Sequence, residues 1–262
     1  MRALFRVVLL IVAAVPAMAG GPGDLPDGGR ARVVEVVDGD TVALDDGRQV
    51  RLVGIQAPKL PLGRPGFRPW PLGEEAKAEL EALALGRTVE LRLAPTPQDR
   101  HGRVLAHVLE VDGGAWLQGR MLERGLARVY TFPDNRALGS EMLALERQAR
   151  ADRLGIWGLP HYAIRTPDNV RHDVGGFQLV EGRVIDVARV KKTLYLNFGA
   201  NWRTDFTIQV DARDEPRFRD AGVDPMTLKG KRVRVRGWVK SKNGPLIELD
   251  HPERLEVLDG PG

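Results

Sequence analysis

The chain contains no cysteine. Disulfide frameworks, thiolate zinc sites and thiol nucleophiles are therefore excluded. Serine is also scarce: Ser140 and Ser241 are the two serines of the chain, and neither lies in the Gly-x-Ser-x-Gly motif of a serine hydrolase. The five histidines lie at positions 101, 107, 161, 172 and 251, without a metal-binding spacing such as His-Glu-x-x-His. The missing residues and spacings thus argue against cysteine-dependent enzymes, serine hydrolases and metal enzymes of the His-Glu-x-x-His type.

The chain also lacks a strong charge of one sign. It has 39 basic and 35 acidic residues, a formal net charge of +4. This balance is not that of a protein that holds polyanions by its overall field, so any phosphate recognition has to be local. With 43% hydrophobic and 28% charged residues, the composition is that of a globular protein and excludes disorder and a polytopic membrane protein.

The longest apolar stretch near the start, Val7 to Val15, is too short to span a bilayer. It follows two arginines at positions 2 and 6 and precedes Ala-Met-Ala at 17–19, which is a small-residue cleavage signal. We therefore predict a signal peptide over residues 1–19, cut after Ala19, and a periplasmic or secreted protein with no stable membrane anchor. The alternative, an uncleaved anchor, is disfavoured by the small residues before Gly20.

The pattern of apolar residues predicts a β-rich first domain over residues 31–162, after a Gly- and Pro-rich linker at 20–30. Strand-like segments are Val33–Val37, Thr41–Leu44, Arg48–Ile55, Thr88–Leu93 and Arg103–Val111. Helical spacing begins near Glu74 and recurs in two later segments, marked by Leu117, Met121 and Leu122 and by Leu138, Met142, Leu145 and Ala149. The first domain should therefore combine a β-meander with three helices.

A second linker at 163–176 and a second domain at 177–258 follow. Strands are expected near Val180–Val187, Thr193–Phe198, Phe206–Val210, Arg232–Val239 and Leu246–Leu249, with a short helix at Glu215–Ala221. Five strands and one helix in so short a segment suit a small barrel of the OB type, a five-stranded Greek-key barrel.

Five motifs resemble the thermonuclease family, whose prototype is staphylococcal nuclease. In order they are Val37-Asp38-Gly39-Asp40-Thr41, Arg51 to Pro58, Asp99-Arg100-His101-Gly102-Arg103, Gly125-Leu126-Ala127-Arg128-Val129 and Leu154-Gly155-Ile156-Trp157. The resemblance implies a five-stranded OB-type barrel with three helices. The segment Leu194–Gly199 is similar to an OB-like module appended in some exported bacterial relatives. The expected fold class is thus α+β, mainly β with helices: this barrel followed by a second small OB-like β-barrel.

In this family a calcium ion and two arginines hold a phosphodiester while a glutamate activates water. The resemblance places the arginines at Arg51 and Arg103 and the first calcium ligand at Asp40, with Asp38 nearby. Two arginines suit a phosphoryl transition state because each offers a fork of donors to its oxygens. An Asp-Gly-Asp turn brings together two hard oxygen donors, which calcium prefers.

The chain departs from the family pattern at two positions. Gln56 stands where the family has a metal-binding aspartate, and Lys59 stands where it has the catalytic glutamate. Lys59 near Asp40 stays charged because opposite charges favour the charged form, so it cannot be a general base and competes with calcium. Losing a general base costs about 10² to 10⁴ in rate. Calcium-dependent hydrolysis by the family mechanism is therefore disfavoured, and no cofactor is firmly predicted.

The second domain carries basic and aromatic residues that suit single-stranded nucleic acid. The candidates are Arg189, Lys191, Lys192, Trp202 and Arg234. Arg234 also shares one face of a strand with the arginines at 232 and 236, and a solvated strand face explains that spacing equally well.

Three hypotheses for the function follow. The chain is a thermonuclease-like protein that binds phosphates, nucleotides or single-stranded nucleic acid with weak or no hydrolysis, which we favour. It is alternatively an active phosphodiesterase or endonuclease with altered metal use, or an envelope protein with a structural or interaction role.

Overall fold

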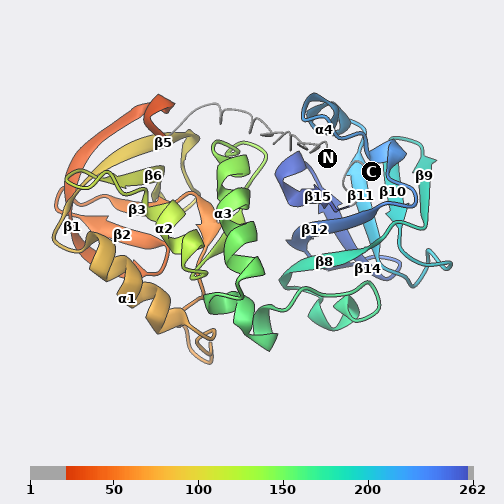
Figure 1. Cartoon of the computed structure of the whole chain (residues 1–262), viewed down its shortest axis with the longest axis horizontal. Coiled ribbons are helices and arrows are strands. Elements are labelled where there is room, and N and C mark those ends of the chain that lie inside the picture. The colour runs from red at the N-terminus through yellow and green to blue at the C-terminus, as the bar shows by residue number, and fades with distance from the viewer. Residues whose placement is uncertain (1–21, 259–262) are drawn as a thin grey trace, which may run out of the picture.

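The computed structural model describes residues 22–258 of the chain. The predicted signal peptide and its cleavage site lie outside the described residues. Two groups of strands lie at opposite ends of the longest axis, with helix α3 between them (Figure 1). The first half ends with this helix and the second half follows it in the chain.

The first half is built on a closed barrel in which the strand order is β1-β2-β3-β6-β5. Its strands are β1 (Asp27–Asp38), β2 (Thr41–Leu44), β3 (Gln49–Leu52), β5 (Thr88–Gln98) and β6 (Val104–Glu110). Neighbouring strands are antiparallel except β3 and β6, which run parallel. Three helices accompany the barrel: α1 (Gly73–Ala84), α2 (Leu117–Glu123) and α3 (Gly139–Ala151). The predicted five-stranded barrel with three helices is confirmed.

A small sheet of β4 (Gly54–Gln56) and β7 (Arg128–Tyr130) lies beside the barrel. The chain turns from β3 into β4 at Gly54, whose φ is 83°. This left-handed backbone conformation strains any residue that has a Cβ atom, and a Cβ here would also meet the end of the Met142 side chain on α3, so the position favours glycine. This turn brings the segment after β3 against α3 and next to the Asp-Gly-Asp turn.

The second half consists of two sheets that share one core. The first has the order β13-β14-β11-β10-β9 and the second has the order β15-β12-β8. The strands are β8 (Phe177–Arg183), β9 (Asp186–Val190), β10 (Thr193–Asn197), β11 (Thr207–Asp211), β12 (Arg232–Trp238), β13 (Lys240–Ser241), β14 (Pro245–Leu249) and β15 (Leu255–Val257), and helix α4 is Glu215–Asp220.

The strand order of the second half is OB-like, although its hydrogen bonds do not close one continuous barrel. Strand β8 leads into β9 and β12 leads into β13, each after a short break, and β11 runs parallel to β14 as β3 does to β6. The breaks at 184–185 and at 239 divide the expected barrel into two hydrogen-bonded sheets. The predicted single strand Val180–Val187 is accordingly two strands.

Both predicted linkers contain residues that belong to the folded halves. Residues 27–30 form the start of β1, where Asp27 pairs with Arg92 of β5. In the 163–176 segment, Arg165 bridges to Val180, and Val170 is fully buried in the second core. The glycine, proline and aspartate residues of both segments mark turns, but contacts with strands that are distant in the chain order these segments.

The two halves are joined by buried charges. Arg236 of β12 is 1% exposed, and its Nη1 and Nη2 donate to Glu146 of α3 at 2.8 and 2.9 Å. Nη2 also donates to Glu256 of β15 at 2.9 Å, and Arg150 of α3 pairs with both glutamates. Each charge has partners of opposite sign, which a buried ion requires.

This network corrects the interpretation of the arginine face on β12. Arg236 is neither solvated nor open to a ligand, because α3 covers it. Arg232 and Arg234 both pair with Glu181 of β8, the latter at 2.6 Å. Alternation placed the three arginines on one face but could not show that the face is an interface. One sequence feature did indicate a buried partner for an arginine: Glu146 lies within the apolar stripe of α3, between Met142 and Ala149.

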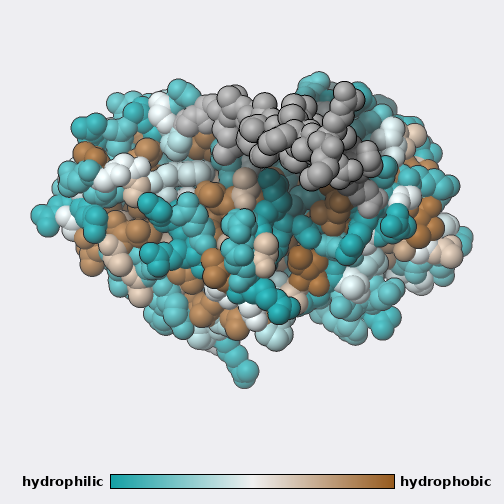
Figure 2. Space-filling model, viewed as in Figure 1, coloured by the Kyte–Doolittle hydropathy of each residue, from teal (hydrophilic) through white to brown (hydrophobic). Residues whose placement is uncertain are grey.

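The face of the molecule shown in Figure 2 is mainly hydrophilic, with hydrophobic residues scattered among the polar ones. Within residues 22–258, no helix is long and apolar enough to cross a membrane.

Candidate active site

The Asp-Gly-Asp turn joins β1 to β2 and holds two buried carboxylates. Asp38 is 4% exposed and Asp40 is fully buried. The backbone N–H of Asp40 donates to Asp38 Oδ1 at 3.1 Å, and the N–H of Ala57 donates to Asp40 Oδ2 at 2.7 Å. Gly39 has no room for a side chain, because a Cβ would lie 2.7 Å from those of Ala57 and Ala76. The turn is therefore packed tightly against α1 and the segment after β4.

The side chain of Lys59 lies directly on this turn. Its Nζ is 2.9 and 2.8 Å from Oδ1 and Oδ2 of Asp40 and 3.5 Å from Oδ2 of Asp38. Burial alone would raise the pKa of Asp40, but the positive charges of Arg51 and Lys59 outweigh it and hold that pKa well below its usual range. Burial and the neighbouring Asp40 raise the pKa of Asp38. An ammonium group thus occupies the position facing both carboxylates.

Arg51 is held in place by the backbone around it. Its side chain is 12% exposed, and it donates to the carbonyl oxygens of Leu52 at 2.8 Å and Ile55 at 2.7 Å. Nη1 also lies 3.2 Å from Asp40 Oδ1. The turn from β3 into β4 supplies these carbonyl groups, so the fold fixes the guanidinium beside the acidic turn before any ligand binds.

Arg103 lies immediately before β6 and is held by Asp99. Its Nε donates to Asp99 Oδ2 at 2.8 Å, while Asp99 Oδ1 accepts from the backbone N–H groups of His101 and Arg103. Burial opposes the charge of Asp99, but these hydrogen bonds prevail and lower its pKa. The side chain of Arg103 is 29% exposed.

A cleft of about 760 Å³ brings these groups together. Arg51, Arg103, Lys59 and Asp38 line it, as do three aromatic side chains that the sequence did not point to: Tyr130, Phe132 and Trp238. The residues predicted for phosphate binding therefore do share one cavity. Trp238 comes from β12, so both halves of the chain form this cleft.

The aromatic wall is ordered by contacts within it. Trp238 Nε1 donates to Tyr130 Oη at 2.9 Å, and the rings of Tyr130 and Phe132 meet edge to face at 5.0 Å. Phe132 is 44% exposed and Trp238 is 45% exposed. Exposed rings beside arginines offer stacking surfaces next to phosphate-binding groups.

The side-chain oxygen of Gln56 is not free to bind a metal ion, because it accepts hydrogen bonds from Arg128. Nε and Nη2 of Arg128 donate to Gln56 Oε1 at 2.9 and 2.7 Å. These residues pair across β4 and β7, and both are buried. Burial lowers the pKa of Arg128 to about 10. Arg128 was visible as part of a family motif, but its contact with Gln56 depends on the pairing of two distant strands.

Among the residues that the structure describes, two of the five candidates in the second half are paired with glutamates, and the other three are not. Arg189 makes a bidentate ion pair with Glu215 at 2.7 and 2.8 Å, and Arg234 pairs with Glu181. Lys191 and Lys192 form the turn between β9 and β10, and Trp202 lies in the loop between β10 and β11. The two arginines are thus committed to glutamates, while the lysines and Trp202 are exposed.

In the part of the chain that the structure describes, no group of three or more His, Cys, Asp or Glu side chains is arranged to hold a metal ion. The acidic turn has two carboxylates and the Lys59 ammonium. Chemically, the cleft can bind an anion through its arginines and stack a planar group on its aromatic wall.

Comparisons with known proteins agree with the fold of the first half. Residues 49–158 match the family described as staphylococcal nuclease homologue. The chain is 32% identical over 196 residues to protein ParB of Escherichia coli, an alignment that covers 67% of this chain and 96% of that protein. It is 30% identical over 171 residues to a micrococcal nuclease of Shigella flexneri, covering 62% and 87%. It is also 30% identical over 131 residues to the endonuclease YncB of Bacillus subtilis, covering 48% and 60%.

Proposed function

Because the chain belongs to the staphylococcal nuclease family, we propose that it is an exported member that binds nucleic acid through Arg51 and Arg103 and hydrolyses it weakly or not at all. The observation that carries this proposal is the contact of Lys59 Nζ with both carboxylate oxygens of Asp40. The family relationship supports a role with nucleic acid, and the contact supports the loss of the usual chemistry.

The residues at the acidic turn do not fit the calcium ion that the family resemblance implies. Calcium takes six to eight oxygen ligands, several of them from carboxylates. Asp38 and Asp40 supply two carboxylates here, and the oxygen of Gln56 already accepts two hydrogen bonds from Arg128. The Lys59 ammonium adds a positive charge where a cation would bind. No step of the proposed function therefore depends on a metal.

The position of the family glutamate cannot supply a general base either. An ammonium group has three donors and no acceptor, so Lys59 cannot remove a proton from water. General-base catalysis contributes about 10² to 10⁴ to a rate. Without it, a bound phosphodiester in this cleft is expected to persist rather than to be cleaved.

Binding remains well supported by the groups in the cleft. Arg51 and Arg103 are both anchored by hydrogen bonds, which leaves little side-chain freedom to lose when a phosphate binds. Charge-assisted hydrogen bonds from a guanidinium to phosphate oxygens are strong and directional. Phe132 and Trp238 add exposed rings on which bases of any sequence can stack.

A repair experiment tests the proposal. Lys59→Glu replaces a positive charge with a negative one, and Gln56→Asp adds a second carboxylate. We expect the double variant to gain calcium-dependent cleavage of single-stranded DNA or RNA by at least about 10²-fold over the unmodified protein. Each single variant should gain much less, because groups that act as a unit are not additive.

The matched control is Lys77→Glu, the same charge change at a partly exposed position of α1, where Lys77 Nζ lies 3.9 Å from Glu81. It should not alter cleavage with calcium or with a chelator. Robust calcium-dependent hydrolysis by the unmodified protein would refute the proposal, because it would show that Gln56 and Lys59 do not disable the site.

A further inference from the structure

The outer face of the five-stranded sheet in the second half carries a second cavity, of about 370 Å³. Along β10, Leu194 and Leu196 point into the core, so Tyr195 and Asn197 point outward. Tyr195 pairs in register with Ala188 of β9, and all three of these outward residues line the cavity. The cavity is thus built on the strand face that OB-type folds use for ligands.

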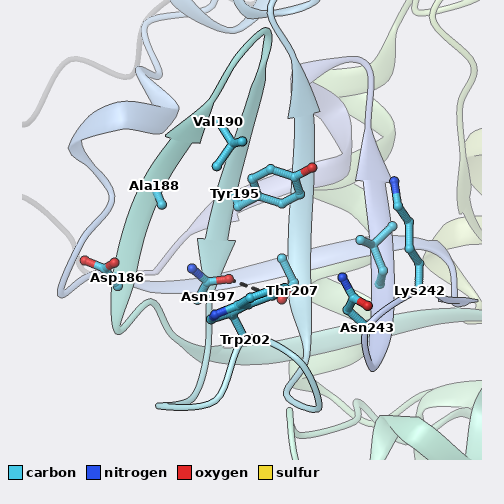
Figure 3. Close-up of a pocket in the computed structure, with 10 residues that line it drawn as sticks. Asp186, Ala188, Val190, Tyr195, Asn197, Trp202, Thr207, Lys242 and Asn243 are labelled. Atoms are coloured by element: carbon cyan, nitrogen blue, oxygen red, sulfur yellow. Dashed lines mark hydrogen bonds between the residues drawn. The ribbon is translucent and has the colours of Figure 1, made fainter.

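Two loops form the walls of the cavity (Figure 3). Trp202, from the loop between β10 and β11, is 50% exposed and lies across one end, near Asn197. Asp205 orders this loop by accepting a hydrogen bond from the N–H of Asn201 at 2.7 Å. Lys242 and Asn243, from the turn between β13 and β14, stand on the other side.

The rim of the cavity, defined as Lys242 together with the residues that directly follow the lining residues Val190 and Trp202, carries cations that lack acidic partners among the described residues. Lys191, Lys192 and Lys242 are exposed and make no ion pair with any residue that the structure describes. The guanidinium of Arg203 stacks on Trp202 at 4.4 Å and likewise has no acidic partner within residues 22–258. The lysine pair forms the turn before β10, and Arg203 lies in the loop between β10 and β11.

The one carboxylate lining the cavity, within the described residues, is Asp186, which pairs with Lys229 at 2.7 Å. Elsewhere on the second half, arginines such as Arg189 and Arg234 are paired with glutamates. Several cations without an ion-pair partner among the described residues thus lie next to a cavity that has an exposed tryptophan and two asparagines.

We propose that this cavity is a second binding site for single-stranded nucleic acid. Trp202 and Tyr195 stack on bases, Asn197 and Asn243 offer amide groups to base edges, and the surrounding lysines contact phosphates. The cation-rich rim favours a polyanion over a neutral sugar or peptide. Strands β9 and β10 lie at the end of the molecule far from the first barrel (Figure 1), so this inference does not depend on the function proposed for the cleft.

Binding is tested with the full chain and a fluorescent oligothymidylate of about 15 nucleotides, close to the largest site of one OB fold. Trp202→Ala should weaken binding about 5- to 150-fold, the range for removing one stacking side chain. Replacing the lysines at 191, 192 and 242 with glutamine should reduce the log–log salt slope by up to about 2. Lys240→Gln is the matched control, because this exposed lysine is paired with Glu248 and should change neither quantity.

Location is tested by photo-crosslinking with an oligonucleotide that carries 5-iodouracil, in a variant with Arg51→Gln and Arg103→Gln. We expect crosslinks within residues 193–203 and an effect of Trp202→Ala that persists in this variant. That result would support the second site even if the cleft binds nothing. Absence of crosslinks in this segment, or unchanged affinity after Trp202→Ala, would overturn the inference. Binding of a neutral oligosaccharide or an uncharged peptide at the cavity, without oligothymidylate binding, would also overturn it.

Discussion

Replacing Lys59 with methionine removes its charge and keeps most of its aliphatic length. In the structure Nζ lies 2.8 and 2.9 Å from the oxygens of Asp40, which is fully buried. Two unit charges at 4 Å attract by about 4 kcal/mol at an effective dielectric constant of 20. Removing one partner of a buried pair costs about 3–5 kcal/mol. Because Lys59 is 21% exposed and Asp40 keeps Arg51, we expect a loss of about 2–3 kcal/mol in the free energy of unfolding.

The assay is urea unfolding at neutral pH, with Lys77→Met as the control. Lys77 makes a partly exposed i,i+4 pair with Glu81, and helix pairs of this spacing contribute about 0.3–0.5 kcal/mol. The difference between the two variants isolates the contribution of the Asp40 contact from the general effect of removing a lysine.

The pH dependence of the free energy of unfolding tests whether the loss of charge causes the lower stability of Lys59→Met. The pKa of Asp40 is lowered in the folded protein, so its stabilising effect is present above its unfolded pKa and is lost as the pH falls through the folded one. The raised pKa of Asp38 acts in the opposite sense, because its contribution is present at low pH and is lost as the pH rises. Without Lys59 both folded pKa values should rise.

The deficit of Lys59→Met should therefore be full at neutral pH and should shrink on acidification, beginning at the raised folded pKa of Asp38 and ending only below the usual aspartate range, at the lowered folded pKa of Asp40. A variant as stable as the parent at neutral pH would refute the ion pair. A deficit that stays constant on acidification would show that lost packing, rather than lost charge, is responsible.

Three further predictions concern the junction, the cleft and the second half. Glu146→Gln should lower the free energy of unfolding by about 3–5 kcal/mol because it removes a buried partner of Arg236. The control Glu253→Gln, which removes the partly exposed partner of Arg136, should lower it by at most about 1 kcal/mol. Equal losses for the two variants in urea unfolding would contradict this prediction. Trp238→Ala should weaken oligonucleotide binding by the cleft about 5- to 150-fold in fluorescence anisotropy, and an unchanged Kd would show that the aromatic wall is not used. A fragment of residues 164–258 should be more stable than one of 177–258 by about 1.5–3 kcal/mol, because Val170 is fully buried in the second core; equal melting temperatures by circular dichroism would contradict this.

Local patterns predicted the elements of the first barrel. Alternation in segments such as Thr88–Leu93 reports which side chains share a face, and the spacing of Leu117 and Met121 reports a helix. The Asp-Gly-Asp turn and Lys59 were also found in the sequence, since they lie in two nearby motifs. Lys59 lies 19 positions after Asp40 in the chain. The contact between them could be anticipated because both positions belong to motifs that lie close together in the family fold and because their charges are opposite.

Other features depend on segments that are distant in the chain. Arg236 lies 90 positions from Glu146, and Trp238 lies 108 positions from Tyr130. Alternation along β12 assigns each residue to a face of the strand, but it carries no information about what covers that face.

The sequence by itself therefore determined the strands, the helices and most of the charged groups of the cleft, because these follow from local spacing and turn chemistry. The tertiary structure alone decided that Arg236 is buried, that Arg128 uses the oxygen of Gln56 and that Trp238 completes the cleft. The burial of Arg236 and the place of Trp238 depend on packing between the two halves, and the contact of Arg128 with Gln56 depends on the pairing of β4 with β7 within the first half. In each case the side chains that meet are separated in sequence by a distance that has no characteristic period.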